Sequence, residues 1–150
     1  MPQSLARILV HLIYSTKNRQ RFISPGLLPK LAAFQAGIYK DLGSPAIEIG
    51  GTTDHVHSLF VLSKTTELCD VIEEVKKGSS RWMKTQGPEY QDFFWQSGYG
   101  AFSVSQSHED KVRRYILNQE EHHRELSFQD EFRVILRKHK VEFDERYVWD

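Results

Sequence analysis

The sequence GGTTDHVHSLFVLSK, residues 50–64, contains the alternation that decides the fold. Residues 54–63 predict a β-strand, because β-branched and large apolar residues follow one another and the run ends in polar residues. Residues i and i+2 of a strand point to the same face. His55 and His57 therefore project side by side from one face, and Val56 points to the other.

The residues before this strand predict a β-α-β order. Residues 6–17 are rich in β-branched and aromatic side chains, which is typical of a buried strand. Apolar residues at helical spacing predict a helix within 24–43, with Ser24 as its N-cap and Gly43 as its C-terminal cap. A short strand is expected at 45–53, joined to the histidine strand by a tight turn.

Four further elements are expected in chain order: an amphipathic helix at 65–85, a glycine-interrupted aromatic strand at 93–105, a helix at about 107–125 capped by Ser107, and a C-terminal helix and tail at 127–150 whose helix is capped by Ser127. The order β-α-β-β-α-β followed by two helices predicts an α+β fold. We expect a ferredoxin-like split β-α-β with an antiparallel sheet over about 6–105 and helices on one face, within a single domain of 150 residues.

Composition narrows the class of protein. The hydrophobic content of 39% and charged content of 27% are ordinary for a globular chain. No apolar run approaches the roughly 20 residues that cross a bilayer, and no signal peptide is recognisable. Cys69 is the only cysteine, so an intramolecular disulfide is impossible. We therefore expect a cytoplasmic protein with no membrane partner.

The charge is unevenly distributed along a chain whose net charge is zero. Residues 1–40 contain six basic residues and no acidic one, and the remaining 110 residues contain 14 basic and 20 acidic ones. Such asymmetry can form a local basic surface that suits phosphates, although it can equally be a solvated face. Lys17, Arg19 and Arg21 are the basic residues between the first strand and the first helix.

The paired histidines are candidate metal ligands. Two neutral imidazoles side by side on a strand can supply two ligands to a divalent ion. The alternative is a pair of surface or hydrogen-bonded histidines. The four histidines His11, His108, His123 and His139 have no partner recognisable in the sequence, and we expect them to be structural or exposed.

The helix at about 107–125 contains a second group of candidates. Tyr115 and Gln119 are four residues apart, so they lie on one helical face, and His122 lies near the same stripe. A tyrosine is a capable nucleophile once activated, and a glutamine carbonyl can bind a hard cation. Arg113 and Arg114 can hold phosphates. The alternative is a core-facing tyrosine in an ordinary amphipathic helix.

Four segments together resemble the single-tyrosine HUH transposases of small bacterial insertion sequences, the IS200-like and REP-associated tyrosine transposases. They are HLIYSTKNRQ at 11–20, HVH at 55–57, WQSGYGAFSVS at 95–105 and RRYILNQ at 113–119. The resemblance implies that His55, His57 and Gln119 hold Mg²⁺ or Mn²⁺, which stabilises charge on a scissile phosphate. It also implies that Tyr115 attacks single-stranded DNA at a hairpin end, giving a 5′-phosphotyrosine and a free 3′-OH that permits strand transfer. Lys17, Arg19, Arg21, Arg113 and Arg114 are the expected DNA-binding residues.

The resemblance implies a homodimer in which the tyrosine helix of one chain can complete the histidine pair of the other. Two further reasons favour a homodimer. Open strand edges must be paired or covered, and the apolar tail residues Phe143, Val148 and Trp149 need a surface to pack on.

Three other functions compete with a transposase. A domesticated protein of the same fold would bind single-stranded DNA hairpins without transposition. A phosphoesterase of the two-histidine kind would need a second His-x-Ser/Thr motif, and HVHS has no clear copy elsewhere in the chain. A structural protein with chance histidines would not explain the four matching segments.

Overall fold

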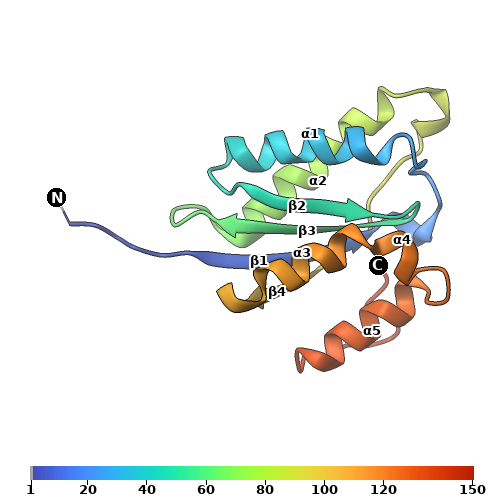
Figure 1. Cartoon of the computed structure of the whole chain (residues 1–150). Coiled ribbons are helices and arrows are strands. Elements are labelled where there is room, and N and C mark those ends of the chain that lie inside the picture. Colours follow the sequence, from blue (N-terminus) through green and yellow to red (C-terminus); the bar gives the residue numbers. More distant parts are fainter. Residues whose placement is uncertain (1) are drawn as a thin grey trace.

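A four-stranded antiparallel sheet in the order β2-β3-β1-β4 organises the chain in the computed structural model, which describes residues 2–150 (Figure 1). Its strands are β1 (Ile8–Ser15), β2 (Ala46–Gly51), β3 (His55–Leu62) and β4 (Gly100–Val104). The central strands β1 and β3 pair along their full length, from Ile8 opposite Leu62 to Ser15 opposite His55. The α+β fold with a split β-α-β sheet is thus confirmed.

Helices cover both faces of the sheet. The helices α1 (Leu28–Asp41) and α2 (Leu68–Lys84) pack on one face, and α3 (Glu109–Leu117), α4 (Gln119–His122) and α5 (Phe128–Lys138) lie on the other (Figure 1). The expectation of helices on one face therefore holds for α1 and α2 alone. The three C-terminal helices add a second layer, because the opposite face of the sheet also carries apolar residues, among them Leu9, Ile13 and Leu59.

Strand alternation assigns each residue of β1 and β3 to a layer. Val56 and Phe60 of β3 join the main core under α1 and α2, together with Val10, Leu12 and Tyr14 of β1. The odd-numbered residues face α3 and α5: these are Leu9, His11 and Ile13 on β1 and His55, His57 and Leu59 on β3. The histidines thus lie in the layer between the sheet and the C-terminal helices.

The aromatic strand is shorter than expected. The strand predicted at 93–105 begins only at Gly100, and the preceding segment is held by a single bridge between Thr16 and Trp95. Phe93 and Trp95 are buried there, whereas Phe94 is 52% exposed. The glycine at 100 is required by packing, since a Cβ there would overlap the ring of Phe132.

The helix predicted at 107–125 is interrupted. Asn118, with φ −101° and ψ 25°, separates α3 from α4, and its N–H bonds to the carbonyls of Arg114 and Tyr115. Ser107 does not cap α3, because it lies in the 3-10 turn Gln106–His108 and its hydroxyl contacts Ser105 Oγ and His108 Nδ1. Ser127 does cap α5, with its hydroxyl accepting from the N–H of Asp130 at 3.1 Å.

The start and end of α1 follow the predicted caps closely. Ser24 Oγ accepts from the N–H of Leu27, so it caps a turn that precedes the helix proper at Leu28. Gly43, with φ +65°, terminates the helix, and its N–H bonds to the carbonyl of Lys40.

The tail folds back onto its own chain. Phe143, Val148 and Trp149 pack against the cluster formed by Phe128, Phe132 and neighbouring residues. The expectation that these tail residues need a partner chain is therefore wrong, because α5 supplies the surface. Within residues 2–150, no helix combines the length and the apolar character needed to cross a membrane.

Candidate metal and tyrosine site

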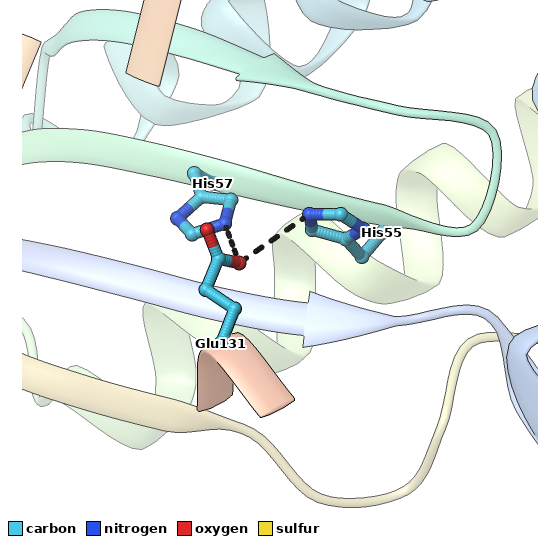
Figure 2. Close-up of side chains that lie close together, drawn as sticks. All are labelled: His55, His57 and Glu131. Carbon is cyan, nitrogen blue, oxygen red and sulfur yellow. Dashed lines mark hydrogen bonds and ion pairs between the residues drawn. The ribbon is translucent and has the colours of Figure 1, made fainter. Parts of the chain in front are cut away.

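His55, His57 and Glu131 converge in the layer between the sheet and α5. The two imidazoles come from β3 and are 0% exposed, and the carboxylate comes from α5 and is 2% exposed. Figure 2 shows that one carboxylate oxygen faces both rings: Glu131 Oε1 lies 3.0 Å from His57 Nε2 and 3.6 Å from His55 Nε2. These three residues form a buried group whose ligand atoms are close enough together to hold one ion.

Glu131 is ionised in this arrangement. Burial alone would raise the pKa of its carboxyl, but hydrogen bonds with His123 and His57 and the nearby histidine charges outweigh burial and lower that pKa well below its usual range. Burial lowers the pKa of His57 to about 4, although Glu131 opposes the shift. The pair is therefore a neutral imidazole donating to a carboxylate.

Gln119 faces the same group from α4. Its Oε1 lies 3.0 Å from His55 Nε2 and 3.1 Å from His123 Nε2. Its Nε2 points to the carbonyl of Tyr115 at 3.4 Å, which orients the amide with the oxygen toward the histidines. The structure thus brings together the three residues proposed as ligands, and it adds Glu131 and His123 to them.

Asp54 and His11 hold the outer nitrogens of the paired imidazoles. Asp54 Oδ1 lies 2.7 Å from His55 Nδ1, and His11 Nε2 lies 2.9 Å from His57 Nδ1. Burial and the neighbouring His57 lower the pKa of His11 well below its usual range, so His11 is neutral. Contacts of this kind fix the orientation of metal-binding histidines.

The donor set of His55 suits a cation. Because a carboxylate accepts, the tautomer of His55 that fits Asp54 carries its proton on Nδ1, and in that tautomer Nε2 has a lone pair. That lone pair faces Gln119 Oε1 and Glu131 Oε1, which are acceptors as well. The same two oxygens also face the Nε2 atoms of His57 and His123, and a divalent cation bound among these ligand atoms would take the place of the protons that those nitrogens donate.

Tyr115 reaches the same carboxylate from α3. Its hydroxyl donates to Glu131 Oε2, and its ring lies edge-on to His57 with centroids 5.7 Å apart. Burial and the Glu131 charge raise the pKa of the phenol, so it is protonated here. His122 lies against the Tyr115 ring, with centroids 4.6 Å apart, rather than among the metal-facing atoms. Tyr115 and the pair His55 and His57 therefore come together within one chain.

Of the five basic residues proposed for DNA binding, two line a cavity beside the site and three lie elsewhere. Arg19 and Arg21 line a cavity of about 540 Å³ together with Asp54 and His123, so they lie beside the site. Lys17 lies over the ring of Phe94 with its Nζ 5.8 Å from the centroid. Arg113 instead pairs with Glu48 of β2 at 3.3 Å, and Arg114 is exposed on α3.

Sequence reasoning missed three residues of the site. His11 and His123, which were expected to have no partner, contact His57 and Glu131 respectively. Burial lowers the pKa of His123, but its bond to Glu131 outweighs burial and raises it overall. Glu131 itself carries a usable signal, since it is an acid on the apolar stripe of α5 between Phe128 and Phe132.

The chain is similar to known proteins in sequence and in fold. A family model described as "Transposase IS200 like" matches residues 4–119. The fold is similar to a crystal structure described as a candidate transposase of Deinococcus radiodurans R1, with a TM-score of 0.62 and 22% identity over 79% of this chain and 98% of that one. It is also similar to a REP-associated tyrosine transposase bound to a REP hairpin, with a TM-score of 0.59 and 12% identity over 82% and 73% of the two chains. No curated protein gave a match.

Proposed function

The chain belongs to the family of IS200-like transposases, and from that premise we propose that it cleaves and rejoins single-stranded DNA through a covalent bond between Tyr115 and a 5′-phosphate. The observation that carries the proposal is the shared carboxylate. Glu131 contacts the Tyr115 hydroxyl with one oxygen and the His57 imidazole with the other. Glu131 thus links the candidate nucleophile to the candidate metal-binding histidines through one carboxylate.

The residues that would hold Mg²⁺ or Mn²⁺ are His55, His57, Gln119 and Glu131. Their converging acceptors favour a hard divalent cation, and imidazole with oxygen ligands suits Mn²⁺ as well as Mg²⁺. When bound, such an ion stabilises the charge that develops on the scissile phosphate. Asp54 and His11 keep the two imidazoles turned toward that position.

The reaction is a transesterification carried by Tyr115. The phenolic oxygen forms a bond to phosphorus as the bond to the 3′-oxygen breaks, and the phenolic proton ends on that 3′-oxygen. Glu131 orients the phenol through their hydrogen bond. Because bond energy is conserved, the 3′-OH of a second strand can reverse the step and join a new partner. We propose DNA hairpin ends as the substrate, as a structurally similar transposase is bound to a REP hairpin.

We propose a homodimer as the assembly. Strands β2 and β4 form the two edges of the sheet, and an edge of this kind is covered or paired in stable proteins. Because Tyr115 reaches the histidines of its own chain, the dimer is not needed to complete the site.

The test is covalent capture of labelled DNA. Wild-type protein incubated with hairpin-bearing single strands and Mn²⁺ should give a band that survives denaturation. Tyr115→Phe should lose the band and bind the same strand with unchanged affinity, because only the nucleophilic oxygen is removed. Tyr99→Phe is the matched control, since that tyrosine is exposed and outside the site. Binding by the wild type without any adduct would instead favour a DNA-binding protein that does not transpose.

A further inference from the structure

A second cavity, of about 510 Å³, opens beside Tyr115 between α3 and α5. We call it the α3–α5 cavity. Its inner end is formed by Tyr115, Glu131 and His11, which also belong to the site. Of the residues that line it, only Leu126 also lines the cavity of Arg19 and Arg21. A molecule in the α3–α5 cavity therefore lies directly beside the reactive phenol.

The side walls of the α3–α5 cavity are apolar. Val104 of β4 and Val112 of α3 form one side, and Val134 and Ile135 of α5 form the other. Val134 is 55% exposed, which leaves an apolar surface on α5 that no part of residues 2–150 covers. Apolar walls on two sides suit a flat ring system, and the volume lies within the range of about 300–1,000 Å³ that is typical of small-ligand pockets.

The rim of the cavity is positively charged. Lys111 of α3 and Lys138 of α5 both line it, and neither forms an ion pair with a carboxylate within residues 2–150. Glu131 is the only acidic residue of the lining, and its two oxygens are occupied by Tyr115 and the histidines. Free ammonium groups beside an apolar slot are complementary to a base that carries a phosphate.

We propose that the α3–α5 cavity is the subsite for the unpaired nucleotide next to the scissile phosphate. The base lies between Val112 and Val134, and Lys111 and Lys138 bind the adjoining backbone phosphate. The inference rests on the proposed function and names the part of the substrate that this cavity takes. Much of the lining belongs to α5, beyond residue 119 where the family match ends, so the subsite is a feature of the C-terminal helix of this chain.

The experiment measures binding without metal. The probe is a fluorescein-labelled DNA hairpin with a single-stranded thymidine flank, compared with flanks that each carry one abasic position. In EDTA, one abasic position should weaken binding to the wild type by about 10-fold, because the apolar contacts between the base and the two valine-lined walls are lost. Val134→Trp fills the slot, so it should weaken binding of the intact flank by a similar factor and abolish the sensitivity to that position. Val141→Trp is the matched control, because Val141 is exposed outside the cavity.

The lysines are tested in the same assay. Lys138→Gln should weaken binding, whereas Lys30→Gln, on α1 at the opposite face of the sheet, should not. Wild-type affinity and abasic sensitivity in both Val134→Trp and Lys138→Gln would overturn the subsite, even if covalent capture succeeds. Selective loss in these variants with no adduct from the wild type would support the subsite while the proposed chemistry fails. A wild type that neither binds nor cleaves the hairpin would overturn both.

Discussion

The hydroxyl of Tyr115 on α3 donates a hydrogen bond to Oε2 of Glu131 on α5. The other oxygen of that carboxylate lies 3.0 Å from His57 Nε2 and 3.1 Å from His123 Nε2. One buried acid on α5 thus contacts Tyr115 of α3 and His57 of β3. The carboxylate holds the phenol and the imidazoles in one arrangement.

Glu131→Gln should weaken Mn²⁺ binding by roughly 10- to 100-fold, the scale seen when the support of a metal site is altered. The amide keeps the shape of the side chain and removes the negative charge that faces both imidazoles. Isothermal titration calorimetry checks this, with Glu142→Gln as a control because Glu142 is exposed in the tail. Equal affinities in Glu131→Gln and wild type would remove Glu131 from the ligand set.

Gln119→Ala should slow cleavage by about 10- to 100-fold and leave measurable activity, because a neutral amide is a weaker ligand than an imidazole. His122→Ala should have a smaller effect, since His122 packs on the Tyr115 ring and not toward the ligand atoms. Single-turnover cleavage at saturating Mn²⁺ measures both rates. A cleavage rate equal to wild type in Gln119→Ala, together with loss of cleavage in His122→Ala, would show that His122 and not Gln119 is the ligand.

The stability of the metal-free protein should fall as the pH is lowered from 7 to 5. Unfolded histidine takes up its proton near pH 6.5, whereas burial holds the pKa of His57 at about 4 in the folded state. The unfolded state therefore binds more protons in this window, which lowers the free energy of unfolding as the pH falls. The raised pKa of His123 acts in the opposite direction. His123 is present both in wild type and in the His57→Gln variant used as the reference, so its effect is common to the two proteins.

Urea unfolding in EDTA at pH 7, 6 and 5 measures this dependence. Wild type should lose about 2 kcal/mol more than His57→Gln, which lacks the titrating group. Curves for the two proteins that stay parallel across the range would contradict a neutral, buried His57.

A homodimer mass is expected from light scattering at micromolar concentration, because β2 and β4 leave two sheet edges. A monomeric wild type would contradict the dimer, and it would leave the site intact within one chain.

Local pattern predicted the histidine face well. Alternation along residues 54–63 sends His55 and His57 to one side whatever the strand pairs with, so the pair was readable from the sequence. The four-residue spacing of Tyr115 and Gln119 also placed both near one site, even though Asn118 breaks the helix between them.

Long-range packing decided what the sequence alone did not predict. His11 meets His57 only because β1 and β3 pair with Ile13 opposite His57, and that register is a property of the sheet. Glu131 reaches the site because α5 packs on the face opposite α1 and α2, and helical periodicity does not choose between the two faces of a sheet. The packing of the tail was not predicted for the same reason, because Phe143, Val148 and Trp149 pack on α5, whose position depends on the long-range packing of the chain.

In the proposed reaction Tyr115 becomes covalently joined to DNA. The most direct measurement is mass spectrometry of the adduct formed in Mn²⁺, after the DNA is digested to a short nucleotide remnant and the protein is cut into peptides. We expect a remnant attached through its 5′-phosphate to Tyr115, and to no other residue. A remnant on another tyrosine, such as Tyr99, or an attachment through a 3′-phosphate, would contradict it.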